Sequence, residues 1–326
     1  MRILSRRQVL ELLSLHDCIE AVENAFRAHA EGRTLGPGVL GVPAARGGFH
    51  IKAAGLLGPR SYFAAKTNAN FPDNPERFGL PTIRGTVVLA DAETGEPLAM
   101  MDSASVTALR TGAATAVAAK YLARPDSRSA TVVGCGAQGE IQLRAIAAVL
   151  PLERVWVLDA DPTRAGGLAV RAQADLGIRV AAARDLHVAL RDSDVCVTCT
   201  PSRRPFVFRD AIAPGTFIAA VGADNRGKQE LEPALVASST LVVDVLEQCA
   251  EIGELQHALA AGLMTRDDVH AELSDVIAGR RPGRTRADEI TIFDSSGTAL
   301  QDVAAAIVVY DNALASGRGT EVKLDD

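Results

Sequence analysis

SATVVGCGAQG, at residues 129–139, joins a short apolar run to a glycine-rich turn. The apolar part, residues 129–133, is predicted to be a buried strand, and residues 140–150 after the turn follow a helical pattern. A second apolar run, residues 154–158, ends on Asp159. Strand, glycine-rich turn, helix, strand and terminal acid follow one another in the order that a dinucleotide-binding βαβ unit requires.

The glycine-rich turn is suited to hold a pyrophosphate. Gly134 permits the tight turn out of the strand, Gly136 lets the backbone approach the ligand, and Gly139 lets the helix pack closely. The helix N-terminus offers N–H groups and the positive end of its dipole to the phosphates. The predicted contacts are Gly134, Gly136, Ala137, Gln138 and Gly139. The alternative is a tight turn in an α/β protein that binds no nucleotide.

Asp159 indicates which dinucleotide this unit prefers. Its carboxylate, at the end of the second strand, is placed to accept hydrogen bonds from the adenosine ribose and to repel a 2′-phosphate. NAD(H) is therefore the predicted cofactor. Arg164 lies close enough in the sequence to weaken this preference, so NADP(H) stays open as an alternative.

The composition is that of an ordinary globular enzyme, with 48% hydrophobic residues. A chain of 326 residues suits two domains that each have a core. The net charge of −6 argues against a general nucleic-acid surface. No basic N-terminal segment leads into an apolar run, and no stretch approaches the roughly 18 apolar residues of a membrane-spanning helix. We therefore expect a cytoplasmic protein without membrane contacts.

The cysteines and histidines predict neither disulfides nor a metal site. The five cysteines are scattered and odd in number, which is typical of a reducing compartment. Cys196 and Cys199 have CxxC spacing, but they fall in a predicted strand, where residues three apart point to opposite faces. The six histidines show no HxxxH or HxH pairing, so we expect no metal.

Strands and helices are predicted to alternate along the second part of the chain. This alternation indicates an α/β fold with a doubly wound parallel sheet of the Rossmann type. The predicted strands are residues 129–133, 154–158, 178–182, 195–200, 216–221, 240–245 and 290–293. We expect residues 126–299 to form this NAD-binding domain.

A smaller α+β domain is predicted from both ends of the chain, residues 1–125 and 300–326. One helix is expected within about the first 30 residues, β structure over residues 36–100, and an alanine-rich helix at residues 105–122. A final helix, residues 297–315, is expected to pack back on this domain, and the tail after it is expected to fray.

Six further motifs occur in order along the chain. They are GLPT at 79–82, DAETGEPLA at 91–99, TALRTGAA at 107–114, VGAD at 221–224, GKQEL at 227–231 and FDSSGTALQD at 293–302. Together with the glycine-rich turn, they make the chain resemble the ornithine cyclodeaminase/mu-crystallin family along nearly its whole length. The resemblance implies a NAD(P)-dependent enzyme that acts on an amino acid or its imine. It also implies a substrate domain that is built from both chain ends and forms a homodimer.

The resemblance assigns three residues to the chemistry. Lys66 and Arg110 match residues that bind the substrate carboxylate, and an arginine fork can bind both of its oxygens. Asp224 matches the catalytic aspartate, which in a reductase orients the imine nitrogen or relays a proton. From the residues alone, a solvated strand residue is favoured for Lys66, a helix-surface cation for Arg110, and an Asx turn for Asp224; the resemblance reverses this preference for Lys66 and Arg110.

The predicted pocket departs from that of the ornithine cyclodeaminases, in which the strand before the lysine carries an acid. This chain has GFHIK at residues 48–52, where His50 and Lys52 share one face of the strand. A distal substrate ammonium would meet a cation there, which argues against ornithine or lysine as the substrate. Lys52 is a candidate to complete the carboxylate clamp, unless it is a solvent-facing edge residue.

Arg84 suggests a hypothesis about substrate size. It follows the motif at residues 79–82 and, if it faced the pocket, would bind a distal carboxylate. An imino-dicarboxylate such as iminosuccinate would then be a candidate substrate. A simple surface arginine is the alternative.

Further cofactor contacts are predicted where strands and helices end or begin. Thr111 is expected near the phosphates, and Val221 and Gly222 near the nicotinamide. The remaining candidates are Thr200, Pro201, Ser296 and Gly297.

The sequence therefore predicts an NADH-dependent reductase of small α-imino acids, which is equivalently an L-amino-acid dehydrogenase. One alternative is a cyclodeaminase that releases ammonia and recycles its NAD internally. A second alternative is a nucleotide-binding protein without catalytic activity.

Overall fold

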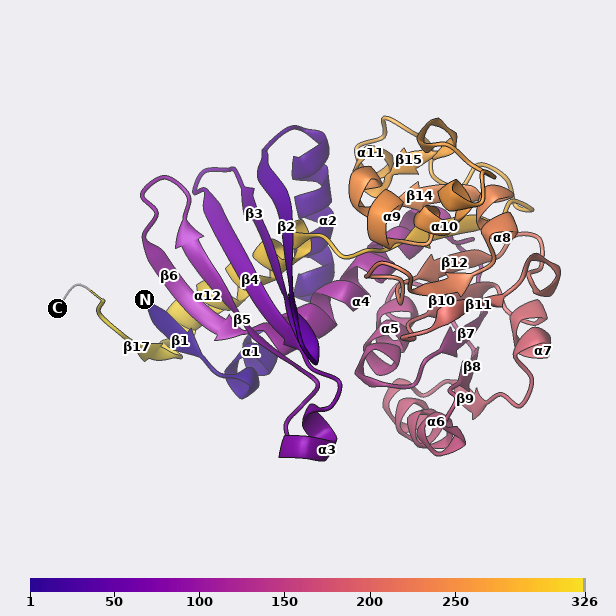
Figure 1. Ribbon diagram of the computed structural model, residues 1–326, viewed down its shortest axis with the longest axis horizontal. Helices are drawn as coiled ribbons and strands as arrows, with labels where there is room; N and C mark the ends of the chain where they lie inside the picture. Colours follow the sequence, from indigo (N-terminus) through magenta and orange to yellow (C-terminus); the bar gives the residue numbers. More distant parts are fainter. Residues whose placement is uncertain (325–326) are drawn as a thin grey trace. The chain divides into compact units, whose positions relative to one another are not determined.

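The computed structural model describes residues 1–324 as two compact units (Figure 1). Unit 1 comprises residues 1–110 and the C-terminal residues from Thr298 onward, and unit 2 comprises Thr111–Gly297. The units divide within helix α4 (Ser103–Leu122), whereas the boundary expected from the sequence lies just after that helix. The second half of α4 belongs to unit 2, where Gly112 packs against Ile141.

Unit 1 is built on a seven-stranded sheet with the order β17-β1-β6-β5-β4-β3-β2. Strands β2 to β6 run antiparallel to one another in a meander. Their bounds are Thr34–Ala44 (β2), Gly47–Leu56 (β3), Tyr62–Asn70 (β4), Ile83–Asp91 (β5) and Pro97–Asp102 (β6). The short strands β1 (Arg2–Leu4) and β17 (Thr320–Glu321) pair with each other beside β6. The frayed tail expected from the sequence is thus wrong up to residue 324, and residues 325–326 lie outside the described residues.

One face of this sheet, called the inner face below, is covered by helix α12 (Ala299–Ser316) (Figure 1). Ala54 of β3 packs there against Ala299 and Leu300. The opposite face is called the outer face. Unit 1 also contains α3 (Asn74–Phe78) and two N-terminal helices, α1 (Arg6–Leu12) and α2 (Leu15–Ala30). A single N-terminal helix was expected, but Ser14 accepts a hydrogen bond from the N–H of Asp17 and so begins a second one.

Unit 2 contains an eight-stranded sheet with the order β15-β14-β16-β12-β10-β7-β8-β9, and all its neighbouring strands are parallel. This confirms the predicted doubly wound sheet. The bounds are Ser129–Val133 (β7), Arg154–Leu158 (β8), Arg179–Ala182 (β9), Val195–Thr198 (β10), Phe217–Ala220 (β12), Thr240–Val243 (β14), Ala271–Glu272 (β15) and Thr291–Asp294 (β16). Two further strands, β11 (Arg203–Val207) and β13 (Gln229–Leu231), pair with each other.

The chain order of unit 2 reverses between β7 and β10. From β7 the chain continues outward through β8 and β9, and it then returns to build β10 on the other side of β7. Such a reversal is where α/β sheets bind ligands, at the carboxyl ends of the strands. The helices between the strands are α5 (Ala137–Ala147), α6 (Pro162–Leu176), α7 (Leu186–Arg191), α8 (Pro233–Ala237), α9 (Leu246–Ile252), α10 (Leu255–Ala260) and α11 (Leu273–Ile277), with 3-10 turns at Arg209–Ala211 and Arg266–Asp268.

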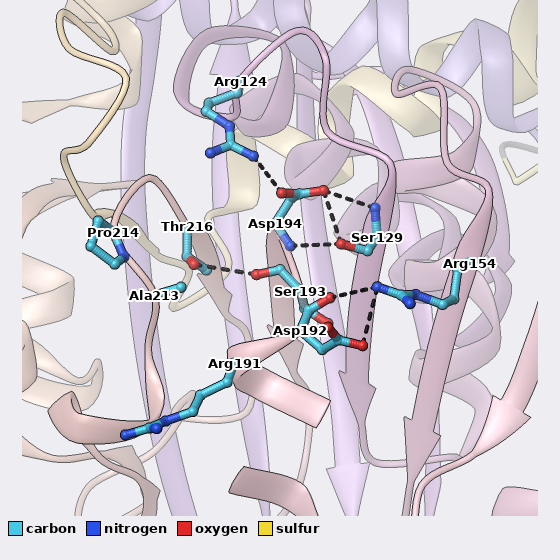
Figure 2. A pocket seen from close by; sticks show the side chains of 10 residues that line it. All are labelled: Arg124, Ser129, Arg154, Arg191, Asp192, Ser193, Asp194, Ala213, Pro214 and Thr216. Carbon is cyan, nitrogen blue, oxygen red and sulfur yellow. Dashed lines mark hydrogen bonds and ion pairs between the residues drawn. The ribbon is translucent and has the colours of Figure 1, made fainter. Parts of the chain in front are cut away.

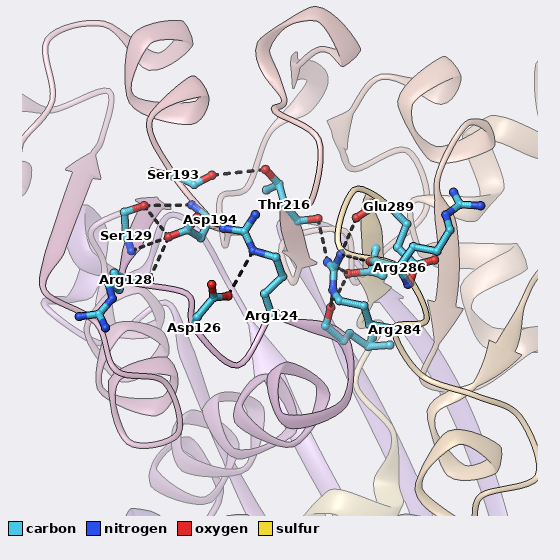
Figure 3. Close-up of polar contacts among 12 residues, drawn as sticks. Arg124, Asp126, Arg128, Ser129, Ser193, Asp194, Thr216, Arg284, Arg286 and Glu289 are labelled. Carbon is cyan, nitrogen blue, oxygen red and sulfur yellow. Dashed lines mark hydrogen bonds and ion pairs between the residues drawn. The ribbon is translucent and has the colours of Figure 1, made fainter.

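Polar contacts, most of them partly buried, hold the amino-terminal edge of this parallel sheet together (Figures 2 and 3). Asp194 accepts hydrogen bonds from the N–H groups of Arg128 and Ser129, and it forms an ion pair with Arg124. Arg284 donates to the carbonyl of Leu122 and to other backbone and hydroxyl oxygens around it. A pocket of about 320 Å³ lies at this edge, but its charged side chains pair largely with one another. This edge therefore serves the fold and lies opposite the carboxyl ends where a ligand is expected.

A helix that crosses a lipid bilayer must be both long and apolar. In the part of the chain that the structure describes, no helix is both long enough and apolar enough to cross a membrane.

Candidate active site

The glycine-rich turn of unit 2 has the geometry that a pyrophosphate site requires. Gly134 has a φ of +102°, a conformation that L side chains rarely adopt. A Cβ on Gly139 would lie 1.9 Å from the carbonyl oxygen of Gly134, so only glycine fits there. A Cβ on Gly136, by contrast, would meet no heavy atom of the described chain within 4 Å. The absence of a side chain at Gly136 thus serves no packing purpose in that part of the protein and leaves space for a ligand.

Asp159 follows β8 and contacts the turn directly. Its Oδ2 accepts a hydrogen bond from the N–H of Cys135 at 2.7 Å, and its Oδ1 accepts one from Asp161 at 2.9 Å. Each carboxylate oxygen can accept a further hydrogen bond, so these contacts are compatible with a ribose hydroxyl. Arg164 lies on α6, and its Nε is 3.6 Å from the carboxylate of Asp161.

Two other loops begin at the same edge of the sheet. Thr200 and Pro201 follow β10, and Val221 and Gly222 follow the neighbouring strand β12. The carboxylate of Glu230 joins these loops, because Oε1 accepts the N–H of Thr200 at 2.6 Å and Oε2 accepts the N–H of Gly222 at 2.8 Å.

Ser296 and Gly297 follow β16 at this edge and are held by a second buried acid. Asp244 accepts hydrogen bonds from the Ser296 hydroxyl and from the Gly297 N–H, each at 2.6 Å. Gln248 donates to the same two residues. The backbone here is therefore fixed by the protein itself, and a cofactor contact by either residue stays a prediction. The same holds for Thr111, which is buried in α4 beside Gly112.

Asp224 lies two residues beyond Gly222 in a half-exposed position. Its carboxylate pairs with the ammonium of Lys228 at 2.5 Å. The loop that carries both residues is anchored, because His257 donates to the carbonyl of Lys228 at 2.7 Å and Gly227 donates to Gln256 at 3.0 Å. Asp224 is thus accessible to solvent on an anchored loop, and its catalytic role stays a prediction.

In unit 1, three charged side chains meet in the buried interior. Lys66 of β4 contacts both carboxylate oxygens of Asp302 on α12, at 2.7 and 2.8 Å. The Nε of Arg110 on α4 lies 2.9 Å from the same carboxylate, and its Nη1 donates to Gln301 at 2.7 Å. Lys66, Arg110 and Asp302 are only 3%, 6% and 1% exposed. Two buried cations therefore share one anion, which leaves a net positive charge that a substrate carboxylate would balance.

Burial sets the charge states of this cluster. Desolvation lowers the pKa of Lys66 to about 7, and the attraction of Asp302 opposes that effect while Arg110 and Lys52 add to it. Burial alone would raise the pKa of Asp302, but the charges of Lys66 and Arg110 hold it below its usual value. Asp302 therefore stays ionised, and Lys66 is the group whose charge changes near neutral pH.

The register of the sheet places Lys52 beside this cluster. Lys52 of β3 lies directly opposite Lys66 of β4, and His50 lies opposite Asn68. Residues opposite one another in an antiparallel pair share a face, so all four lie on the inner face.

Comparison with known proteins identifies the family of this chain. Residues 1–317 match the model of the ornithine cyclodeaminase/mu-crystallin family. The chain belongs to this family. It is similar to the iminosuccinate reductase of Paracoccus denitrificans, with 36% identity over 332 residues that cover 99% of this chain and 100% of the relative.

Two solved structures of similar proteins hold a nicotinamide cofactor. An archaeal alanine dehydrogenase dimer with bound NAD shares 41% identity at a TM-score of 0.95, and the match covers 99% of each chain. The Thermococcus litoralis Δ1-pyrroline-2-carboxylate reductase, in complex with NADH and L-proline, shares 35% identity at a TM-score of 0.95. That match covers 99% of this chain and 100% of the other. These relatives are oxidoreductases whose names give different substrates.

In this family member, Arg84 and Lys66 lie on opposite faces of the unit 1 sheet. Arg84 of β5 lies opposite Ala69 of β4, whereas Val87 lies opposite Lys66. Because side chains alternate along a strand, Arg84 projects from the outer face and Lys66 from the inner face. Arg84 lines a different pocket, together with Phe49 and Thr67. The expectation that Arg84 contributes to the substrate pocket is therefore corrected for this chain, and it no longer argues for a dicarboxylate.

Three buried acids at or near the candidate site had no role in the sequence-based prediction. These are Asp302, Glu230 and Asp244. Asp302 carried a signal, because it is an acid near the start of the otherwise apolar stretch of α12. Glu230 lies in the motif at residues 227–231, but nothing in the sequence indicates its role, and Asp244 carried no signal, since each acts on backbone groups that only the folded loops bring near.

Proposed function

We propose that this protein uses NADH to reduce a small α-imino acid to an L-amino acid, or catalyses the reverse dehydrogenation. The observation that carries this proposal is the pair of buried cations, Lys66 and Arg110, that share the single carboxylate of Asp302. Such a site suits a ligand with one carboxylate, which is what an α-imino acid presents beside its C=N bond. The relatives named for alanine, iminosuccinate and pyrroline-2-carboxylate support the same class of substrate.

The residues of unit 2 fit NAD(H). The open space at Gly136 and the N-terminus of α5, which no described side chain caps, suit the pyrophosphate. Asp159 is the proposed partner of the adenosine ribose, and its charge disfavours a 2′-phosphate. When bound, the cofactor supplies the hydride that reaches the imine carbon.

The chain's own side chains handle the rest of the reaction. Arg110 and Lys66 bind the substrate carboxylate, and Lys52 contributes positive charge from the next strand. Asp224 hydrogen-bonds the imine nitrogen, which takes up a proton as the carbon takes up hydride. The net reaction consumes one imine, one NADH and one proton, and it releases one amine and NAD⁺.

The position of Lys52 argues against the cyclodeaminase alternative. It lies opposite Lys66 on the inner face, so a second substrate ammonium would approach its positive charge, while the acid of this cluster, Asp302, is already paired with Lys66 and Arg110. Ammonia release from ornithine without net change in NADH would nevertheless establish that alternative. Tight NADH binding without turnover of any substrate would support the non-catalytic alternative.

We also propose that the protein is a homodimer that associates through the outer face of the unit 1 sheet. The strand register places four exposed apolar residues on this face, and exposed apolar side chains on one face are typical of an interface. They are Leu40 (56% exposed), Val42 (44%), Phe49 (40%) and Phe63 (37%). The archaeal alanine dehydrogenase is a dimer, which supports the proposed dimeric state.

A spectrophotometric screen tests the proposed reaction. NADH and NADPH are each combined with keto acids plus ammonia or methylamine, and with cyclic imines. We expect NADH to be consumed in equal amount to the amine formed, and faster than NADPH. Lys66→Met and Arg110→Met should abolish turnover while NADH binding persists, because these residues contact the substrate. Consumption that continues unchanged in both variants would contradict the proposal.

A further inference from the structure

Glu230 is buried beneath the loops after β10 and β12, which both carry predicted cofactor contacts. It lies on β13 and is 0% exposed. Each oxygen of its carboxylate serves a different loop, since Oε1 accepts the N–H of Thr200 and Oε2 accepts the N–H of Gly222. Thr200 and Gly222 follow the adjacent parallel strands β10 and β12, so one side chain ties two neighbouring strand ends together.

Glu230 packs tightly against Gly222 and Thr200. A Cβ on Gly222 would lie 2.4 Å from the carboxyl carbon of Glu230 and 2.4 Å from the carbonyl oxygen of Thr200. Glycine at this position therefore allows the loop, the carboxylate and the neighbouring loop to meet. The motif residues Gly222 and Glu230 thus depend on each other, although eight residues separate them.

Glu230 is itself held in place by a second layer of buried acids. The carboxylate of Glu254 accepts the N–H groups of Glu230 and Leu231, at 2.7 and 3.2 Å. Asp294, at the end of β16, in turn accepts the N–H groups of Glu254 and Leu255, at 3.0 and 2.9 Å. Each of the three carboxyl groups thus accepts a pair of backbone N–H groups, so the side chains form a chain of contacts from β16 to the two loops.

We propose that Glu230 is a positioning residue that fixes the loops after β10 and β12 in the geometry that receives the nicotinamide half of the cofactor. This inference rests on the proposed function, because it assumes that NAD(H) binds at this edge of the sheet. The side chain of Glu230 offers one acceptor oxygen to each loop, so it satisfies both loop N–H groups at once. A buried N–H that loses its acceptor destabilises the loop that carries it.

The variant Glu230→Gln tests this inference. The glutamine amide keeps the size of the side chain but presents an NH₂ group to one loop N–H, which frees one of the two loops. In the absence of cofactor, we expect hydrogen exchange at the amide of Thr200 or Gly222 to become about tenfold faster. We also expect about tenfold weaker binding of NADH. Binding of ADP-ribose, which lacks the nicotinamide, should stay unchanged because it depends on the glycine-rich turn and Asp159.

The matched control is Glu289→Gln. Glu289 also accepts two backbone N–H groups, those of Thr285 and Arg286, but it precedes β16 at the opposite edge of the sheet. This variant should change neither ligand's affinity. A Glu230→Gln protein that loses affinity for NADH and ADP-ribose equally would show a general structural role and overturn the inference. Unchanged affinity for both would also overturn it.

The wild-type protein provides a test that does not depend on the variant's folding. The amides of Thr200 and Gly222 should be protected from exchange without any cofactor, and exchange as fast as in exposed loops would overturn the inference. The proposed function fails by a different result, namely NADH binding without turnover of any imine. The comparison of NADH with ADP-ribose needs no turnover, so the two failures are distinguishable.

Discussion

At the scale of single residues, burial gives Lys66 and Asp302 properties that neither has in water. An exposed lysine stays protonated well above neutral pH, but Lys66 is only 3% exposed, and burial lowers its pKa to about 7. Asp302 is the carboxylate that pairs with both Lys66 and Arg110. Substrate binding and stability should therefore depend on these two residues in different ways.

Binding of a substrate-like carboxylate should weaken as pH rises above about 7. Lys66, with its pKa lowered to about 7, is charged below that pH and neutral above it, and only the charged form attracts a carboxylate. The Kd of pyruvate with NAD⁺ present should therefore rise by up to about tenfold per pH unit above neutrality. Calorimetry across this range measures it. Lys66→Arg stays charged and should flatten the profile, whereas identical profiles in both proteins would contradict the assignment.

Replacing Asp302 should destabilise the fold strongly. Asp302→Asn leaves Lys66 and Arg110 buried without a carboxylate, and breaking such a pair costs about 3–5 kcal/mol. Denaturant unfolding of the variant measures this loss. The control is Glu20→Gln, which removes an acid that is 65% exposed and pairs with His16 at the surface. It should change stability little. Equal stability of both variants would refute the role of Asp302.

At the scale of elements, the βαβ unit shows how closely local sequence can specify structure. Strands β7 and β8 begin and end at the predicted residues, because alternation and apolar character are local signals. The short strands β1 and β17 were missed, since two or three residues show no period. Arg84 was assigned to the pocket because the sequence does not reveal which strand residues lie opposite one another.

Substitutions at two glycines of the turn, Gly139 and Gly136, should affect folding and cofactor binding separately. Gly139→Ala places a Cβ 1.9 Å from the Gly134 carbonyl oxygen and should lower the melting temperature clearly, since backbone must move. The added Cβ of Gly136→Ala meets no heavy atom of residues 1–324 within 4 Å, so its melting temperature should match the wild type. Its NADH affinity should nevertheless fall at least about tenfold, because the methyl group occupies the proposed pyrophosphate space. Thermal melts and fluorescence titration measure both quantities. Normal NADH affinity in Gly136→Ala would place the pyrophosphate elsewhere.

At the scale of the whole molecule, the two faces of the unit 1 sheet have different proposed roles. The inner face carries the buried charges under α12, and the outer face exposes apolar side chains of β2, β3 and β4. We expect a second copy of the chain to bury this exposed apolar face.

The charge variant Leu40→Glu should convert the proposed dimer to a monomer. Leu40 lies on the outer face, where a buried carboxylate would be strongly unfavourable at an interface. The control is Val39→Glu, one residue earlier on the inner face and 47% exposed, which should leave the dimer intact. Light scattering coupled to size exclusion gives the mass of each protein. Two dimeric variants, or a monomeric wild type, would contradict the proposed interface.

The sequence by itself determined the Rossmann-type sheet, the glycine-rich turn and the acid after β8, because each depends on residues close together in the chain. It also named Lys66, Arg110 and Asp224, through motifs shared with a family. Only the tertiary structure decided which groups, far away in the chain, pair with the residues of the site. Lys66 meets Asp302 across 236 residues, and Glu230 joins two loops that belong to different strands. Charge compensation and backbone pairing across such separations depend on register and packing, which no local pattern encodes.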